Sequence, residues 1–385
     1  MKILFVHDFP STKNKGKYYS TGFPYEIWNR YLKIFDKLII SSRLKIETNI
    51  YGQKESSGQN VEFHPIKSYK NILSLLRNRK KIIEELSSVI DLADGVLIRV
   101  PSVLGFIAAK ICIDKNKPYM VEVVGAAYEA YRFHGSLSGK ILAVPMELIQ
   151  KKIVKKANVS IYVTNSFLQN KYPSNGKIYG GITDVMKLEK INFSKVDFNE
   201  KIIKIGIIGS TYTRYKGHKE AFKALKILKK NGFKVELQLV GQGLSKNVEN
   251  DIKKYKLSHN VKFLGEIYDR NLLNQWFTEI DIYIQPSMTE GLCRSLIESV
   301  CLNKVTFSSD VGGNTDIISK IYTFKQKDYK KLANLITKAI VNPEFRKKNI
   351  VENKKLVSEL NIDSVDYRRK RALIDFKYIV EEQYK

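Results

Sequence analysis

The alternation of two kinds of segment constrains the fold of this chain more than any other feature. Short apolar runs rich in β-branched residues are followed by longer stretches with apolar residues at helical spacing, as in residues 71–90. Such alternation predicts parallel strands with helices on both faces of a sheet, which is an α/β protein. In the first half the expected strands are residues 2–6, 37–40, 95–98, 118–123 and 159–162.

The same rhythm restarts after a polar, irregular segment at residues 183–200, which indicates a linker. We therefore expect two doubly wound, Rossmann-like domains that face each other, residues 1–185 and 186–362, with a cleft and the active site between them. A charged helix at residues 363–385 could pack back on the first domain. The expected strands of the second half are residues 202–208, 234–240, 261–264, 281–284 and 304–307.

The charge balance and the cysteines limit the partners and the compartment. The chain has 66 Lys and Arg against 39 Asp and Glu, a formal net charge of +27, which favours an anionic partner. Cys112, Cys293 and Cys301 form no C-x-x-C pair and cannot supply a disulfide framework, so we expect a reducing, cytoplasmic compartment. The first apolar run is too short for a signal peptide, and no stretch approaches the roughly 18 to 20 apolar residues of a membrane span. We expect a soluble or peripheral protein.

Several common site motifs are absent from the sequence. Val6 is followed by His-Asp-Phe-Pro rather than by the glycine triplet of a dinucleotide-binding turn, and residues 135–141 match a phosphate-binding loop only superficially. No H-E-x-x-H motif, Cys and His cluster or D-x-D pair indicates a zinc site or a metal-dependent sugar-nucleotide site. No Gly-x-Ser-x-Gly elbow is present. We therefore expect neither a metal nor a cofactor.

Residues 205–218 are the first informative segment. Gly209 and Ser210 end an expected strand, Lys216 follows, and Gly217 and His218 precede a helix. Backbone N–H groups at such a turn, together with a lysine ammonium, suit a diphosphate. An ordinary surface turn before a helix can contain the same residues, so this segment alone leaves both interpretations open.

Residues 284–298 are the second. A strand ends, a turn presents Glu290, and a helix begins near Leu292 with first-turn N–H groups that can bind an anion. Glu298 follows two helical turns later, so both carboxylates could accept hydrogen bonds from the hydroxyls of one ligand. Each also has a structural explanation, as an acid favoured by the helix dipole or as a solvated surface acid. The phosphate-like turn upstream favours the functional interpretation.

Together these segments resemble the retaining glycosyltransferases of family 4, which have the two-domain GT-B architecture. The likeness rests on the two glutamates and the preceding Pro286 and Ser287, and it extends from residue 204 to about residue 318. Residues 121–125, 161–168 and 172–177 add a weaker likeness to members that build bacterial capsular, exopolysaccharide or lipopolysaccharide chains. The other shared motifs are Asp310-Val-Gly312-Gly313, Val240-Gly241-Gln-Gly243 and Lys216-Gly217.

The resemblance implies a role for each matching residue. Lys216 would neutralise the donor diphosphate and Glu290 would approach the transferred sugar at its reacting face, which makes these two the expected catalytic residues. Glu298 would bind the ribose of the nucleotide. The residues expected to bind the donor are Gly22 of the first domain's glycine-rich loop, Gly209, Ser210, Arg214, Ile267 beside the base, the amides of Leu292, Cys293 and Arg294, and Glu298.

The sequence departs from the family pattern in two places. Ser210 occupies a position where many members have arginine, and Arg214 is a candidate substitute. Many members also have a histidine after the fourth strand of the first domain, where this chain has Gly-Ala-Ala-Tyr-Glu at residues 125–129. The candidates for contact with the reacting sugar from this domain are Tyr128, Glu129 and His134. His7 ends the first strand, and it has either a structural role or a place in the cleft.

The resemblance implies a retaining, metal-independent hexosyltransferase. It would move a sugar from a nucleotide-diphosphate sugar, a UDP-sugar, to a saccharide or polyprenyl-diphosphate-linked saccharide in bacterial surface glycan biosynthesis. A sugar-nucleotide epimerase or a non-catalytic relative with the same fold is the alternative. A nucleic-acid-binding protein is a remote alternative, and we expect no nucleic-acid partner, because the glutamates would stay unexplained and no aromatic and basic recognition module is present.

Basic clusters at residues 77–81, 151–156 and 368–371 suggest where an anionic surface would bind. In the segment 137–157, apolar residues recur at near-helical spacing beside lysines, which is typical of a helix lying on an anionic membrane. A helix packed on a sheet with a lysine-rich outer face explains the pattern equally well. With the net charge, we expect a protein peripheral to the inner face of the cell membrane. The apolar residues are Ile141, Leu148, Ile149 and Ile153.

Overall fold

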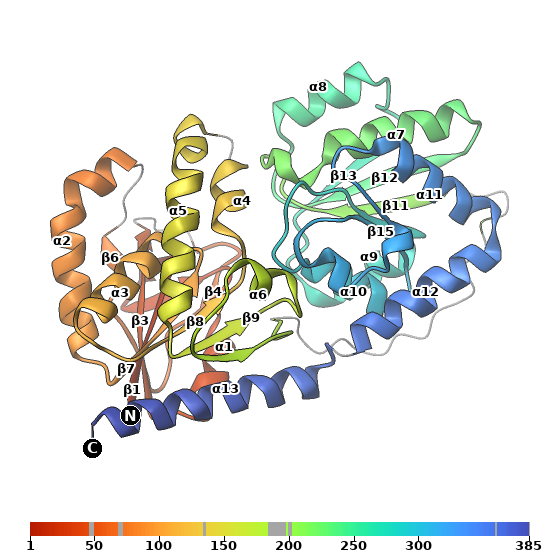
Figure 1. Cartoon of the computed structure of the whole chain (residues 1–385). Helices are drawn as coiled ribbons and strands as arrows, with labels where there is room; N and C mark the ends of the chain where they lie inside the picture. Colours follow the sequence, from red (N-terminus) through yellow and green to blue (C-terminus); the bar gives the residue numbers. More distant parts are fainter. Residues whose placement is uncertain are drawn as a thin grey trace. The chain divides into compact units, whose positions relative to one another are not determined.

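The computed structural model describes residues 1–45, 50–67, 72–133, 136–183, 198, 202–358 and 360–384. It divides into two compact units (Figure 1). Unit 1 contains Met1–Tyr131, Ile141–Ile182 and Val365–Lys385, and unit 2 contains Arg132–Lys140 and Thr183–Ser364. His134 and most of the expected linker at residues 183–200 lie outside the described residues.

Unit 1 is built on a mainly parallel sheet in the order β10-β9-β8-β7-β1-β2-β4, with β3 also paired to β1 and with β5 and β6 paired to β3. Residues 3–6 of β1 pair with residues 95–98 of β7 on one side, while residues 2–6 pair with residues 37–41 of β3 on the other. The strands are β1 (Lys2–Asn14), β2 (Lys17–Ser20), β3 (Lys37–Lys45), β4 (Lys54–Glu55), β5 (Val61–Phe63), β6 (Ile66–Lys67), β7 (Gly95–Val100), β8 (Tyr119–Val123), β9 (Val159–Tyr162) and β10 (Lys177–Tyr179).

The first strand differs from the sequence prediction. It continues past Val6 to Asn14, with a register shift between Val6 and Pro10, and then turns into an antiparallel hairpin with β2. Lys15 and Gly16 form the turn with φ values of 45° and 82°. Two residues with positive φ are what a tight hairpin turn requires. The alternation rule missed the hairpin because residues 7–14 mix polar and apolar side chains.

Helices cover both faces of the unit 1 sheet. Helix α13 packs on the same hydrophobic core as α1, where its Phe376 and Val380 are fully buried. Gly95 of β7 leaves room for this helix, because a Cβ there would lie 2.8 Å from a methyl group of Val380. The helices are α1 (Tyr25–Leu32), α2 (Ile72–Asp91), α3 (Val103–Asp114), α4 (Ala127–Arg132), α5 (Leu137–Lys156), α6 (Phe167–Lys171) and α13 (Ile362–Gln383).

Unit 2 has an all-parallel sheet in the order β13-β12-β11-β14-β15-β16, covered by helices on both faces (Figure 1). Together with the sheet of unit 1, this confirms the α/β fold class. The strands are β11 (Ile203–Ile208), β12 (Val235–Val240), β13 (Val261–Gly265), β14 (Ile282–Gln285), β15 (Val305–Ser309) and β16 (Thr323–Phe324). The helices are α7 (His218–Lys230), α8 (Lys246–Lys254), α9 (Arg270–Glu279), α10 (Arg294–Cys301), α11 (Tyr329–Val341) and α12 (Pro343–Ser358).

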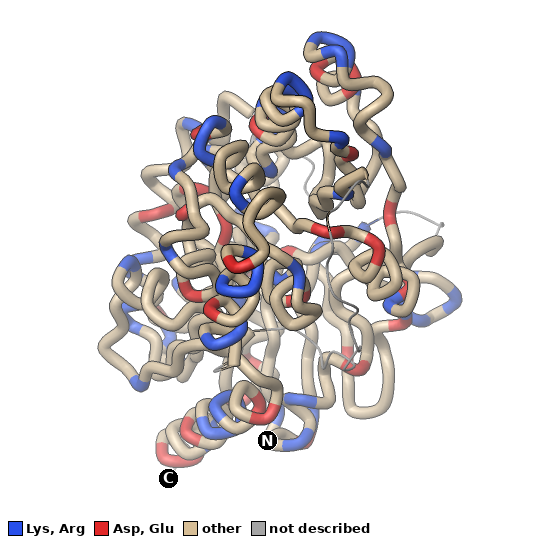
Figure 2. Tube along the Cα trace, turned by 90° about the vertical axis from the view of Figure 1, so that its right-hand side faces the viewer, with Lys and Arg blue, Asp and Glu red and all other residues tan. Residues whose placement is uncertain are grey.

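The basic residues are distributed along the whole trace rather than gathered in one place (Figure 2). Helix α13 carries residues of both signs. Within the described ranges, no helix combines the length and the apolar character that a membrane span requires. A membrane contact of this chain would therefore have to be argued from an individual surface.

Candidate active site

The candidate site lies at the carboxyl ends of β11 and β14, which are neighbours in the sheet of unit 2. From β11 the chain proceeds outward through β12 and β13, whereas from β14 it proceeds in the opposite direction through β15 and β16. Ligands of parallel sheets bind at such a reversal, because the loops after the two strands diverge there. The loops after these strands contain residues 209–217 and 286–293.

Two glycines allow these loops to pack closely. Gly217 and Gly312 have φ values of 76° and 55°, in the left-handed region that favours glycine. A Cβ on Gly217 would overlap the backbone carbonyl of Pro286, and a Cβ on Gly312 would overlap that of Glu290. The loop that carries Glu290 is therefore in direct contact with the loops on both sides, and neither glycine can be replaced without displacing backbone.

Lys216 and Glu290 form the centre of the site. The Lys216 Nζ donates to Glu290 Oε1 at 2.8 Å, and the same oxygen accepts from Ser287 Oγ at 2.7 Å and from Gln285 Nε2 at 3.1 Å. The lysine and glutamate side chains retain only 19% and 10% of their exposure. The structure thus brings together the two residues that the sequence predicted as catalytic.

A buried tyrosine orients the amide of Gln285. The Tyr283 hydroxyl donates to Gln285 Oε1 at 2.6 Å, which turns the amide nitrogen toward Ser287 and Glu290. Burial raises the pKa of Tyr283 well above its ordinary value, so the hydroxyl keeps its proton and can donate. Sequence analysis identified neither Gln285 nor Tyr283 as part of the site, because their role depends on contacts across the sheet end rather than on a motif.

Electrostatics favour the charged form of the lysine. Burial is the largest single effect and would lower the pKa of Lys216, but the charge and hydrogen bond of Glu290 together with Cys293 and Tyr215 outweigh it, so the pKa lies above its ordinary value. Lys216 is therefore an ammonium at any physiological pH. Its stem crosses the end of β11 at Gly209, where an added Cβ would lie 2.9 Å from the Lys216 Cγ.

The predicted amides lie at the start of α10. Cys293 is the residue before the first turn, its side chain makes no capping hydrogen bond to the helix, and Arg294 begins the helix. N–H groups in a first helical turn have no partner within the helix, and the helix dipole adds partial positive charge there. Burial and the nearby Glu290 raise the pKa of the Cys293 thiol to about 12, so Cys293 is not a nucleophile at neutral pH. Leu292 is half-buried beside it.

Glu298 has a partner that the sequence did not indicate. Its Oε1 accepts a hydrogen bond of 2.8 Å from Nη1 of Arg270, which is the first residue of α9. The other terminal nitrogen of Arg270, Nη2, is buried and without a hydrogen-bond partner in the described part of the chain. The structure therefore assigns the two glutamates to different cations, Glu290 to Lys216 and Glu298 to Arg270. Arginine residues near a strand end carry no spacing signal that could have predicted this pair.

The remaining donor candidates of unit 2 lie around these loops. Ser210 is half-buried and accepts a weak hydrogen bond of 3.4 Å from the N–H of Tyr212. Arg214 is exposed and lines a pocket beside His218 rather than pairing with Glu290. Ile267 is half-buried in the connection between β13 and α9. Their roles at the donor stay predictions.

Gly22 and the candidates for the reacting sugar lie in unit 1. Gly22 follows β2 in a bend, and its donor role stays a prediction. Glu129, on α4 next to Tyr128, is held by an ion pair of 2.5 Å with Lys171. Burial and the charge of Arg99 lower the pKa of His7 to about 3, which makes this imidazole neutral. No group of three or more His, Cys, Asp or Glu among the described residues could hold a metal ion.

Comparison with known proteins adds independent information. A family model described as glycosyl transferases group 1 matches residues 189–356. Protein CapJ of Staphylococcus aureus is 50% identical over 384 residues, which cover 100% of this chain and 98% of CapJ. The segment that the family model matches, residues 189–356, contains both loops of the candidate site.

Solved structures share the fold at low sequence identity. Anabaena HepE in complex with UDP-glucose has a TM-score of 0.66 at 15% identity, covering 97% of this chain and 99% of HepE. Sucrose-phosphate synthase from Thermosynechococcus elongatus has a TM-score of 0.66 at 14% identity, covering 95% and 96%. The lipopolysaccharide outer core galactosyltransferase WaaB has a TM-score of 0.64 at 15% identity, covering 97% and 99%.

Proposed function

Because the chain belongs to the group 1 glycosyl transferases, we propose that it transfers a sugar from a nucleotide-diphosphate sugar, with UDP as the nucleotide, to a saccharide acceptor. The fold is the GT-B fold of its structural neighbours. The complex of HepE with UDP-glucose supports a UDP-sugar as the donor. The name of CapJ and the likeness of residues 121–125, 161–168 and 172–177 to polysaccharide-building members support a product in a bacterial capsule.

The Lys216–Glu290 ion pair carries this proposal. Without a donor the two charges neutralise each other at 2.8 Å. A diphosphate offers Lys216 a stronger partner, and the hydroxyls of a sugar offer Glu290 donors that replace the ammonium. The Lys216 ammonium is therefore already in position to stabilise the negative charge that develops on a leaving nucleotide. Such preorganised charge usually makes a large contribution to catalysis.

The rest of the donor would bind the flanking groups. The first-turn N–H groups of α10, which begins at Arg294, would bind the diphosphate as an anion site. Glu298 would accept hydrogen bonds from the ribose hydroxyls, held in place by Arg270. The Nη2 of Arg270, which has no hydrogen-bond partner among the described residues, would donate to a ribose or phosphate oxygen.

We propose transfer with retention of the anomeric configuration and without a metal. The acceptor hydroxyl would attack C1 on the face from which UDP departs, the bond from C1 to the phosphate oxygen would break, and the acceptor proton would pass to that oxygen. Lys216 and the α10 amides supply the positive charge that a metal provides in other sites. Product NMR showing inversion at C1, or loss of activity in EDTA that added Mn²⁺ restores, would contradict this mechanism.

A thermal-shift panel tests the donor assignment. UDP, GDP, ADP and CMP are compared on wild type, Lys216→Ala, Glu298→Ala and the control Lys230→Ala, which changes an exposed lysine at the far end of α7. UDP should raise the melting temperature of wild type and of the control, because a ligand that binds only the native state stabilises it. The rise should be smaller in the two site variants. A wild type that no nucleotide stabilises at millimolar concentration would remove the main support for the donor site.

A lipid-linked acceptor is the second part of the proposal, and α5 supports it. The stripe of exposed apolar residues on this helix, spaced by three and four residues, lies on one helical face. Exposed lysines continue that face through the last turns of the helix. Ile153, one of the residues expected in the pattern, is buried instead and anchors the helix on its other side. The stripe consists of Leu137, Ile141, Val144 and Leu148, and the lysines are Lys151, Lys152, Lys155 and Lys156.

An apolar stripe that leads into lysines fits the interface of an anionic bilayer, where apolar side chains enter the acyl boundary and lysines meet the headgroups. We propose that α5 brings the enzyme to the inner face of the membrane, where a polyprenyl-diphosphate-linked saccharide would be the acceptor. An ordinary surface helix exposes apolar residues singly, whereas this stripe is continuous over three turns.

Vesicle sedimentation tests the membrane contact. Vesicles of phosphatidylglycerol mixed with phosphatidylcholine should bind wild type, and vesicles of phosphatidylcholine alone should bind it weakly. The double variant Val144→Ser, Leu148→Ser should lose about tenfold in binding or more, because two side chains no longer transfer into lipid. The matched control Val351→Ser, Leu356→Ser removes exposed apolar residues of α12 and should bind like wild type. Equal loss in both double variants would contradict a specific role for α5.

A further inference from the structure

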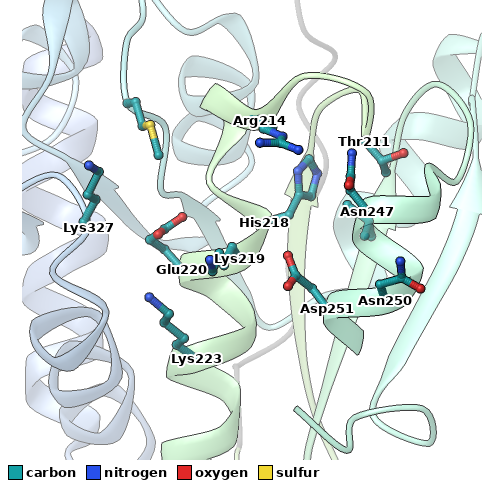
Figure 3. A pocket seen from close by; sticks show the side chains of 12 residues that line it. Thr211, Arg214, His218, Lys219, Glu220, Lys223, Asn247, Asn250, Asp251 and Lys327 are labelled. Atoms are coloured by element: carbon teal, nitrogen blue, oxygen red, sulfur yellow. The ribbon is translucent and has the colours of Figure 1, made fainter. Parts of the chain in front are cut away.

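Unit 2 has a second pocket, of about 530 Å³, at the base of α7 and α8 (Figure 3). Its walls come from the segment that joins β11 to α7, from the first turns of α7 and α8, and from the loops that contain Met288 and Lys327. The volume falls within the roughly 300–1,000 Å³ of small-molecule sites. None of Lys216, Glu290 and Glu298 lines it, and it shares only Arg214 with the residues expected to bind the donor.

Two buried side chains of α7 that can accept hydrogen bonds line this pocket. Glu220 is 5% exposed. His218 is 4% exposed, and its Nε2 is buried without a hydrogen-bond partner there. Its ring is hydrogen-bonded to the Gly209 backbone, and burial lowers its pKa to about 4, which keeps the imidazole neutral. A buried imidazole nitrogen without a partner costs free energy, so a ligand that donates a hydrogen bond to it would relieve that cost.

Cations line both sides of the pocket, with Arg214 beside His218 and the lysines on the side of Glu220. Arg214, Lys219 and Lys327 are exposed, and no ion pair engages them among the residues that the structure describes. Lys223 is half-buried, with its ammonium 4.7 Å from the centre of the Tyr329 ring. These cations outnumber the carboxylates of the pocket, which within the described chain are Glu220 and Asp251. The lining therefore has an excess of positive charge.

One cation has an unusual backbone conformation. Lys327 has a φ of 64°, a conformation that side chains other than glycine seldom adopt. Its neighbour Gln326 donates to the carbonyl of Met288 at 2.6 Å, which ties this loop to the loop that leads to Glu290. Residues held in sparsely populated backbone regions are concentrated at ligand sites, because the surrounding structure has to impose them.

The polar groups are divided between the two sides of the pocket. Figure 3 shows Arg214, His218 and the polar side chains of α8 on one side, and Glu220 and Lys219 with two further lysines on the other. Carboxylate, amide and neutral imidazole groups bind the hydroxyls of a polyol, whereas lysines bind a phosphate. The α8 residues are Asn247, Asn250 and Asp251, and the lysines are Lys223 and Lys327.

From this division we propose that the pocket binds a phosphorylated sugar or polyol, with its hydroxyls toward His218 and Asp251 and its phosphate toward Lys223 and Lys327. The bound ligand would affect the donor site through the backbone, because His218 is separated from Lys216 only by Gly217, which packs against Pro286. Occupancy of the pocket would thus hold the loop that positions Lys216. This regulatory consequence rests on the proposed function, whereas binding itself does not.

Isothermal titration of the full-length protein with glucose 6-phosphate tests the proposal, with glucose, inorganic phosphate and UDP titrated separately. Glucose 6-phosphate should bind wild type saturably, and glucose and phosphate should each bind at least about tenfold more weakly, because each lacks one half of the interactions. Asp251→Asn and Lys327→Ala should each weaken binding about tenfold. The control Lys230→Ala, on the exposed end of α7, should leave it unchanged.

Comparison with the donor site separates this proposal from the proposed function. Lys216→Ala should lose UDP binding and retain glucose 6-phosphate binding within about twofold, whereas Lys327→Ala should show the reverse. The proposal would be overturned if glucose 6-phosphate gave no saturable binding at roughly tenfold above a millimolar dissociation constant. Inorganic phosphate that binds as strongly as glucose 6-phosphate would also overturn it. The same holds if UDP competes with glucose 6-phosphate and the Lys216→Ala variant loses glucose 6-phosphate binding. A failure of the donor assignment alone would leave the result with glucose 6-phosphate unaffected.

Discussion

Replacing Lys216 with methionine is the sharpest test of the candidate active site. Methionine keeps an unbranched apolar stem beside Gly209 and removes only the ammonium that donates to Glu290 at 2.8 Å. Glu290 would retain its hydrogen bonds from Ser287 and Gln285, so its carboxylate would be partly satisfied. The substitution therefore separates the loss of one charge from the loss of packing.

The expected loss of stability is small, and the expected loss of activity is large. Surface ion pairs contribute about 0–1 kcal/mol and broken buried pairs cost about 3–5 kcal/mol, so a pair with 19% and 10% exposure and two remaining hydrogen bonds should cost about 1–2 kcal/mol. For a unit of this size, that lowers the melting temperature by roughly 3–6 °C. Removing a preorganised charge from the leaving group should lower kcat/KM about 10²–10³-fold, which corresponds to about 3–4 kcal/mol.

The assay combines UDP-sugar turnover with thermal denaturation of the same preparations. Lys230→Met is the matched control, because it makes the same chemical change at an exposed position at the end of α7. Its turnover should equal that of wild type. A Lys216→Met enzyme with turnover within threefold of wild type (under about 0.7 kcal/mol), and with an undiminished thermal shift in UDP, would refute the reasoning that Lys216 stabilises the departing diphosphate.

Three further outcomes follow from the structure. Gly312→Ala should lower the melting temperature and reduce turnover by more than Gly232→Ala, because a Cβ at Gly312 would overlap the carbonyl of Glu290 at a φ of 55°, whereas Gly232 at φ 85° has open space around it; equal effects in both variants would contradict the argument. The pKa of His218 is lowered from 6.5 to about 4, so the stability that the neutral imidazole contributes is present above pH 6.5 and lost as the pH falls toward 4. Over that interval, urea denaturation should show that the free energy of unfolding falls by about 3 kcal/mol more in wild type than in His218→Gln. Cys293 is buried with a pKa of about 12, and mass spectrometry of the native protein treated with iodoacetamide at pH 7.5 should find it unmodified, with labelling only after unfolding.

Most of the ten expected strands were predictable from the sequence to within a few residues, whereas the short strands β2, β4, β5, β6, β10 and β16 were not predicted. Residues 159–162 were predicted as a strand and are β9, and residues 202–208 were predicted where β11 is Ile203–Ile208. These runs are buried on both faces, so nearly every residue is apolar and the signal is local. The hairpin that pairs residues 12–14 with residues 17–19 was missed, because residues 7–14 mix polar and apolar side chains and the turn at Lys15 and Gly16 has no Asn-Gly or Gly-Gly signature.

The site was predictable where a residue acts through its own backbone or its own charge. Gly217 and the acidic residue at position 290 carry such signals. The partner of Glu298 was not predictable, because Arg270 lies 28 residues earlier on another helix. The pocket beside α7 was not predictable either, since its lining depends on how α7 and α8 pack.

The amino-acid sequence by itself determined which segments become strands and helices, where glycine is obligatory, and which charged residues are available for a diphosphate and a sugar. Those properties depend on neighbours within one or two turns of chain, and periodicity records them. Only the tertiary structure decided that Lys216 meets Glu290, 74 residues later. That contact exists because β11 and β14 lie side by side in the sheet, and the order of strands depends on the packing of the whole unit rather than on any local pattern.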